Sequence, residues 1–121
     1  MNDVAEIIGG EKVIAIYESW PAFHDAEVHS IACECDEKKV IIVLVLDAAM
    51  AHVTLRFDDC EDVRLEGFGR QNVLFELGIE RQVSLSRATF NITLDASVGL
   101  EGGFVCRGIE VLDVDLKARS S

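Results

Sequence analysis

The sequence predicts a mainly-β protein, an antiparallel β-sheet or sandwich of about seven strands with a short N-terminal helix. Three observations support this fold class. Apolar and polar residues alternate from Ala26 onward, turn-forming residues separate the alternating segments, and helical spacing is confined to the first 19 residues. Half of the 121 residues are hydrophobic, and no linker or internal repeat is visible, so residues 1–121 are expected to form a single domain with its own core.

Helical spacing occurs near the N-terminus. Residues 3–9 could form one helical turn before a glycine pair. Apolar residues then recur at spacings of three and four across residues 11–19, which predicts a helix. A strand is the alternative, because β-branched residues are frequent here. Pro21 disfavours a helical Trp20, and this stop signal favours the helix.

The remaining chain reads as strands. Residues 40–46 are continuously aliphatic, which predicts a strand buried on both faces. Residues 51–57 alternate apolar with polar side chains and should be exposed on one face. The strands expected from these patterns are 27–35, 40–46, 51–57, 63–65, 73–79, 89–94 and one long strand over 104–116.

Charge and composition narrow the function. The chain carries 11 basic and 22 acidic residues, a net charge of -11. Nucleic-acid binding is disfavoured because it uses basic surfaces, and anionic membranes are disfavoured for the same reason. A basic protein partner would be attracted. No apolar run is long enough to span a bilayer and no cationic leader opens the sequence, so a cytoplasmic location is expected.

The chain has four cysteines, and they do not form a metal-binding pattern. Cys33 and Cys35 share one strand face, whereas Cys60 and Cys106 are far away in sequence. A zinc site needs two further ligands brought close, and no second close pair exists. Disulfides are not expected in a reducing compartment. We therefore interpret the cysteines as small buried hydrophobes and expect no metal and no cofactor.

The segment between the helix and the first strand holds the only Trp and the only Pro of the chain. Trp20 and Phe23 can bury large surfaces at this corner. The segment reads Trp20-Pro21-Ala22-Phe23-His24-Asp25-Ala26-Glu27-Val28. It resembles a Trp-Pro-Ser-Phe-His-Asp-Ala-Glu motif of the bacterial immunity protein 50 family, with Ala at the Ser position. Residues 71–75 and 103–106 are similar to later segments of that family. The resemblance implies a mainly-β fold and a protein that neutralises a cognate toxin of a polymorphic toxin system.

Within this motif, His24 and Asp25 are the strongest candidates for chemistry. A His next to a carboxylate can serve as a general base or a metal ligand. Adjacent residues on a strand point to opposite faces, however, so the two would not act on one group. No nucleophile elbow, phosphate loop or HExxH pair is present. We interpret the pair, with Trp20, Pro21 and Glu27, as a structural corner without a catalytic role. His29 and His52 are read as ordinary sheet residues.

The densest acidic cluster lies between two predicted strands, in residues 58–62. It could cover a cationic groove on a toxin, such as a basic nuclease, in place of phosphates. The alternative is a solvated turn, the more common role of a charge run. The cluster consists of Asp58, Asp59, Glu61 and Asp62.

Three functional hypotheses follow. The first is a non-enzymatic immunity-like protein that binds a cognate toxin and blocks it. The second is a small metal- or thiol-dependent enzyme that uses His24, Asp25 and the cysteines. The third is a homo-oligomeric β module with a scaffolding role, although an immunity protein could also form a homodimer.

Overall fold

A computed structural model describes residues 7–35, 40–48, 51–84 and 87–116, and it confirms a mainly-β fold with one short helix. The described elements form one helix and eight strands. They are α1 (Gly10–Tyr17), β1 (Glu27–Cys35), β2 (Val40–Asp47), β3 (Ala51–Asp58), β4 (Glu61–Glu66), β5 (Val73–Ser84), β6 (Arg87–Val98), β7 (Glu101–Cys106) and β8 (Gly108–Leu116).

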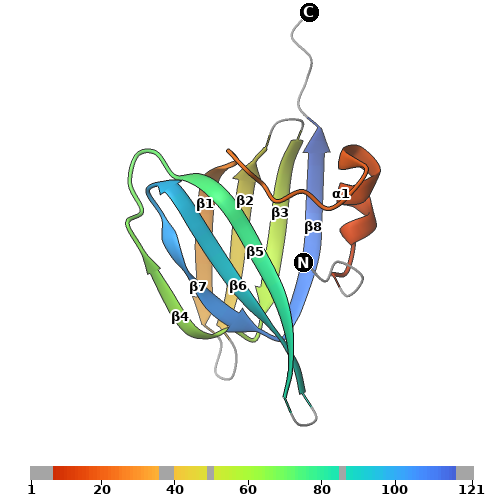
Figure 1. Ribbon diagram of the computed structural model, residues 1–121, viewed down its shortest axis with the longest axis vertical. Helices are drawn as coiled ribbons and strands as arrows, with labels where there is room; N and C mark the ends of the chain where they lie inside the picture. The colour runs from red at the N-terminus through yellow and green to blue at the C-terminus, as the bar shows by residue number, and fades with distance from the viewer. Residues whose placement is uncertain (1–6, 36–39, 49–50, 85–86, 117–121) are drawn as a thin grey trace, which may run out of the picture.

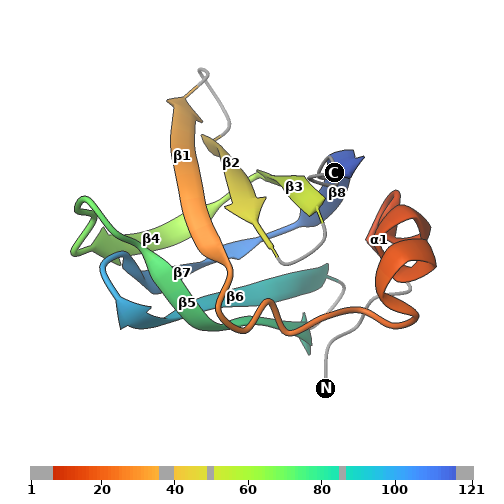
Figure 2. The same cartoon turned by 90° about the horizontal axis from the view of Figure 1, so that it is seen from above.

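The eight strands form one antiparallel sheet in the order β4-β7-β6-β5-β1-β2-β3-β8. The link between β5 and β1 is narrow, because the only paired positions of these two strands are Glu27 and Val73. At this link the sheet folds over, so that β1, β2, β3 and β8 form one layer and β5, β6, β7 and β4 form the other (Figures 1 and 2). Phe57 of β3 and Phe104 of β7 meet edge to face between the layers, with ring centroids 5.0 Å apart. The molecule is therefore a sandwich made from one folded sheet.

The core follows the alternation of the strands. On β3, every second residue from Ala51 to Phe57 is fully buried, as the sequence predicts. On β2, Ile42, Leu44 and Leu46 are fully buried, whereas the residues between them are only half-buried. The expectation that β2 is buried on both faces is therefore wrong. A two-layer sandwich covers only one face of each sheet, and the aliphatic residues on the other face pack beside their neighbours in a central strand.

The predicted single strand over residues 104–116 is wrong as well. The chain turns at Arg107, so that β7 pairs with β6 in one layer and β8 pairs with β3 in the other. The burial pattern changes phase at this point: Phe104 and Cys106 are buried on β7, but Ile109 and Val111 are buried on β8. A strand has a strict period of two, so this phase change marks a break rather than a continuous strand.

The N-terminal region differs in part from expectation. The helix α1 lies within the predicted 11–19 segment apart from its first residue, and it buries Val13. Residues 7–9 are not helical, because Ile8 forms a parallel bridge with Glu110 on β8. Residues 3–6 of the predicted first turn lie outside the described part of the chain. Ile8 and α1 thus lie along β8 at one edge of the sandwich (Figure 1).

Candidate functional site

The corner segment lies along β5 and is held by its backbone. The amide of Leu77 donates to the carbonyl of Ala22, and the amide of Asp25 donates to the carbonyl of Leu74, both at 2.9 Å. The amide of Leu74 in turn donates to the carbonyl of Ala26 at 2.9 Å. Side chains are unnecessary for these contacts, which fix where the chain enters β1 at Glu27.

The aromatic residues of the corner pack as the sequence predicts. Phe23 is only 3% exposed, and Trp20 meets it edge to face at 5.7 Å while packing partly against the core. Pro21 between them is half-buried. Phe23 and Asp25 both adopt positive φ angles, 59° and 65°. A bulky residue in this conformation is uncommon, and burial of the ring offsets its cost.

His24 and Asp25 lie in a turn, not on a strand, so the expectation that they point apart is wrong. His24 Nε2 is 3.5 Å from Asp25 Oδ2. The other ring nitrogen, Nδ1, is 2.9 Å from the carbonyl oxygen of Phe75, and the His24 and Phe75 rings meet edge to face at 5.1 Å. Since a carbonyl can only accept, Nδ1 carries the proton in this contact. The His24 side chain therefore anchors the corner to β5.

The acidic segment is mostly not a turn. Only Asp59 and Cys60 connect β3 to β4, while Glu61 and Asp62 belong to β4. Arg107 pairs with Asp59 at 3.2 Å and lies 4.0 Å from Glu61. The Arg107 amide also donates to the Asp58 carbonyl at 2.9 Å. The two chain crossings between the layers, β3 to β4 and β7 to β8, are thereby joined side by side.

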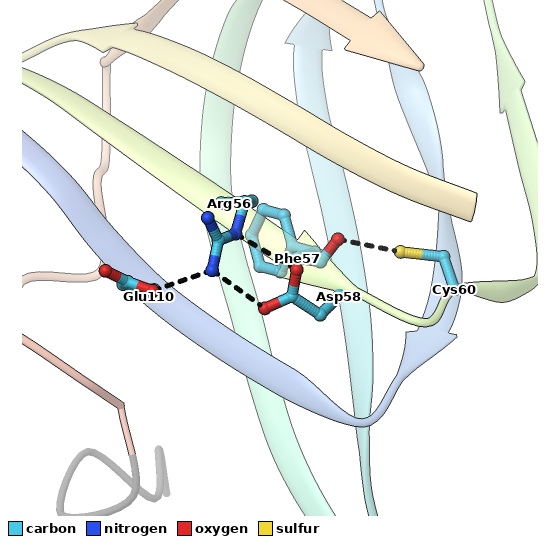
Figure 3. A network of polar contacts seen from close by, with 5 residues as sticks. All are labelled: Arg56, Phe57, Asp58, Cys60 and Glu110. Carbon is cyan, nitrogen blue, oxygen red and sulfur yellow. Dashed lines mark hydrogen bonds and ion pairs between the residues drawn. The ribbon is translucent and has the colours of Figure 1, made fainter. Parts of the chain in front are cut away.

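A second arginine neutralises the remaining end of this segment (Figure 3). Arg56 Nε lies 3.0 Å from Asp58 Oδ1, and Arg56 Nη2 lies 2.7 Å from Glu110 Oε1. Nearby, the Cys60 thiol donates to the Phe57 carbonyl at 3.3 Å. Of the four acidic residues proposed from the sequence, only Asp62 has no ion pair within the described residues. The cluster is largely an internal ion-pair network at the layer crossing.

Another acidic surface, which the sequence reading missed, crosses the outer face of the β4-β7-β6-β5 layer. Glu66 on β4 pairs in register with Glu101 on β7, and Glu76 on β5 pairs with Asp95 on β6. Leu94 on β6 pairs with Gly102 on β7, and the same antiparallel register, extended by one residue, brings Asp95 beside Glu101. The result is one row across four strands, in which every carboxylate is exposed and none has an ion pair among the residues described. We call this the acidic row: Glu66, Glu101, Asp95 and Glu76.

Apolar and small residues border the acidic row. Phe75, beside Glu76, is 52% exposed because a bulge in β5 shifts the register between Leu74 and Glu76. At the other end, an open hollow is lined by Arg64, Leu65, Glu66 and Gly102. Exposed aromatic residues are enriched at protein-binding surfaces. These four strands lie side by side on the near side of the molecule in Figure 1.

Asn72 is a further residue whose role the sequence did not reveal. It is 4% exposed, and its Oδ1 accepts from the amides of Gly69 and Leu100, each at 3.0 Å. Its Nδ2 donates to the Gly69 carbonyl at 2.9 Å. Asn72 therefore ties together the loops that follow Glu66 and precede Glu101, and it positions that end of the acidic row. A lone Asn in a turn-rich stretch carries no sequence signal for this role.

The cysteines divide into two pairs. Cys33 and Cys35 are exposed, and Cys60 and Cys106 are buried. Burial raises the pKa of both Cys60 and Cys106 to about 12, so these thiols are protonated and poorly nucleophilic at neutral pH. The prediction of small buried hydrophobes thus holds for Cys60 and Cys106 and is wrong for Cys33 and Cys35. No group of three or more His, Cys, Asp or Glu side chains within the described ranges has the arrangement of a metal site.

Two histidines that looked isolated in the sequence are neighbours. The rings of His29 and His52 lie 6.4 Å apart, and His52 Nδ1 is 3.9 Å from Asp47 Oδ1. His29 belongs to β1 and His52 to β3, whereas His24 lies in the corner before β1.

Among the described helices there is none with the length and apolar character to cross a bilayer.

Comparison with known proteins gives no match to a family model, a curated protein or a solved structure. The resemblance to the immunity protein 50 family therefore depends on the residues of the corner motif and the two short segments after it.

Proposed function

We propose that this protein is an immunity-like protein that binds a cognate bacterial toxin in the cytoplasm and blocks it without turnover. The observation that carries the proposal is the acidic row, in which like charges face each other across adjacent strands. Directly opposed like charges destabilise a sheet. A cationic partner surface would relieve this repulsion, and the relief would add a favourable term to the free energy of binding.

The row suits a toxin with a basic groove, such as a nuclease. Adjacent strands lie about 4.8 Å apart, so four carboxylates on four strands form a dense line of negative charge. A nucleic acid backbone is also a dense line of negative charge. Phe75 beside Glu76 supplies an aromatic anchor of the kind that dominates binding energy in protein interfaces. Together they would occlude the toxin's substrate groove.

The acidic segment at residues 58–62 contributes less to this surface than the sequence suggested. Asp58, Asp59 and Glu61 already lie near Arg56 or Arg107. A toxin cation would have to compete with these internal partners. The net charge of -11 would still steer a basic toxin toward the molecule, which predicts an association rate that falls as salt is added.

The test is co-expression with the neighbouring toxin-like gene, followed by co-purification and measurement of affinity. The wild-type protein should rescue growth and bind the toxin. The double variants Glu66→Gln/Glu101→Gln and Glu76→Gln/Asp95→Asn should weaken binding at least about tenfold, which corresponds to about 1.4 kcal/mol. The matched control, Glu11→Gln/Asp113→Asn, removes the same charge from exposed positions elsewhere and should bind like the wild type.

Two results would count against the proposal in different ways. If the toxin kills equally in the presence of the wild-type protein, the immunity role fails for that pair. If rescue occurs but both acidic-row variants bind as well as the control, the role stands and the assigned surface is wrong. Stoichiometric metal in freshly purified protein would instead support the metal-dependent enzyme hypothesis.

A further inference from the structure

The second half of β1 is an open sheet edge. Residues 30–35 pair with β2 on one side, whereas pairing with β5 on the other side ends at Glu27. A register shift at His29 marks the point where β1 leaves β5. In Figure 2, β1 runs away from the layer formed by β5 and β6. No other described strand pairs with this edge, so within the described part of the chain its outward amide and carbonyl groups have no strand partner.

The two outer edges of the sheet are protected, whereas none of the described residues protects this one. On β8, Ile8 exchanges backbone hydrogen bonds with Ile109 and Val111, at 3.0 and 2.7 Å, and the exposed Asp113 and Asp115 follow. On β4, a register shift and a positive φ of 52° at Asp62 distort the edge. Charges and bulges of this kind prevent strands from pairing with other chains. Residues 30–35 contain no bulge, no Pro and a single charge, Glu34.

The side chains along this edge favour pairing with an identical strand. Ile31 and Cys33 lie opposite Leu44 and Ile42, on the core side of the sheet, yet Cys33 is exposed because no strand of the other layer covers it. Ser30 and Ala32 on the other side are small and exposed. With one charge in six residues, the edge offers little to recruit a strand of opposite charge. Apolar and small side chains can instead meet their own copies at low cost.

We propose that two copies of this chain pair antiparallel through residues 30–35 of β1 and form one continuous sheet across a twofold axis. A twofold axis makes each strand its own antiparallel partner. Registers centred on Ala32 or Cys33 place Glu34 opposite Ser30 or Ala32 of the second copy. Both registers avoid the repulsion that a register centred on Glu34 would create. The dimer uses a different surface from the acidic row and does not depend on the proposed function.

The dimer should be weak and strengthened by salt. Six residues of strand edge form a small interface of the transient class. Each copy carries a net charge of -11, so the copies repel over distances that salt screens. This salt dependence is opposite in sign to that expected for binding a basic toxin through the acidic row. The two associations can therefore be distinguished in the same buffers.

Sedimentation velocity on the full chain, with a reductant to prevent disulfides, tests the dimer. The wild-type dimer fraction should rise with protein concentration and with salt. Cys33→Lys places two ammonium groups at the paired edges. The substitution should lower the association constant of the dimer at least about tenfold. Ser97→Lys makes the same charge change at an exposed position on β6 and should retain the dimer. A wild-type protein that stays monomeric, or a Cys33→Lys variant that dimerises as well as Ser97→Lys, overturns the proposal.

Hydrogen exchange gives a second measurement that needs no substitution. Amides in a peptide covering residues 30–35 should become more protected as the concentration rises, while those of β4 should not change. A dimer whose formation leaves residues 30–35 unprotected would use another surface and would also refute the proposal.

Discussion

Glu66 on β4 and Glu101 on β7 lie directly opposite each other on the outer face of the sandwich. Two exposed carboxylates in register on neighbouring strands repel, and no cation within the described residues pairs with either. The fold therefore retains a local cost at a position where a neutral residue would be more stable. Such a cost is expected where a surface serves binding rather than stability.

Neutralising this pair should stabilise the protein. The double substitution Glu66→Gln/Glu101→Gln keeps the side-chain shapes and removes the repulsion, so the free energy of unfolding should rise by about 0.2–1 kcal/mol at low salt. Urea denaturation with and without added salt measures the change. The gain should shrink as salt screens the wild-type repulsion. A variant that is less stable than the wild type at low salt would show that the carboxylates do not repel in the folded protein.

Substitution of Asn72 should lower the stability of the protein more than substitution of most other polar residues. Asn72→Ala removes the acceptor for the Gly69 and Leu100 amides in a buried site, so the free energy of unfolding should fall by about 2–3 kcal/mol. Chemical denaturation measures the loss. Gln71→Ala, at the exposed neighbouring position, is the control and should change stability by less than about 0.5 kcal/mol. Equal effects of the two substitutions would contradict the role given to Asn72.

His24→Ala should lower stability modestly and, because His24 only supports Phe75 at the border of the proposed surface, should weaken toxin binding less than the acidic-row variants do. The substitution removes the hydrogen bond to the Phe75 carbonyl and the ring contact with Phe75, at an exposed site, for a loss of about 0.5–1.5 kcal/mol. Thermal unfolding and the growth-rescue assay together measure both effects. Unchanged stability with lost protection would instead place His24 in the toxin interface.

The four thiols should react in two classes. Cys33 and Cys35 are exposed, whereas Cys60 and Cys106 are buried and have a pKa raised to about 12. A disulfide reagent at neutral pH should therefore modify two thiols rapidly in the native protein and all four after denaturation. Mass spectrometry of the modified peptides identifies them. Rapid native modification of Cys60 or Cys106 would contradict their burial.

Stability should fall in strongly alkaline solution through the same two buried thiols. Their folded pKa of about 12 exceeds the ordinary value of 9.0, so above pH 9 the unfolded chain loses protons that the folded protein keeps. The protonated thiols therefore leave the free energy of unfolding unchanged below pH 9, and this free energy falls as the pH rises toward 12. Cys106→Ala should show a shallower decline than the wild type over this range in pH-dependent denaturation. Parallel declines would exclude Cys106 as a cause.

Strand positions could be predicted from the sequence because one face of each layer is buried. The alternation over residues 51–57 reports the buried face of β3 directly, and β1 has the predicted bounds. The break at Arg107 was missed, although the shift from Phe104 and Cys106 to Ile109 and Val111 records it. A change in the phase of the alternation can be detected in a single sequence. Which strand pairs with which cannot be deduced from that pattern.

The candidate surfaces were harder to predict, for a physical reason. The acidic row joins residues from four strands, and only the register places Glu66 by Glu101 and Glu76 by Asp95. The acidic segment, by contrast, is obvious in the sequence. Its ion pairs are not: Asp58 pairs with Arg56, two residues earlier on β3, and Asp59 pairs with Arg107 of the distant turn between β7 and β8. Charge density along the chain therefore points to acidic residues that already have internal ion-pair partners, and not to the acidic row, which has none among the described residues.

The last strand along the chain, β8, completes the layer that β1, β2 and β3 begin, by pairing with β3. Closure of that layer thus depends on pairs that are distant in sequence, from Asp58 with Gly108 to Ala51 with Leu116, and a topology of such long-range pairs folds slowly. During synthesis, the nascent protein cannot complete this layer until residues 108–116 have left the ribosome. A chain that stops before them would leave β3 as an unpaired edge strand with exposed apolar side chains, which chaperones and proteases recognise.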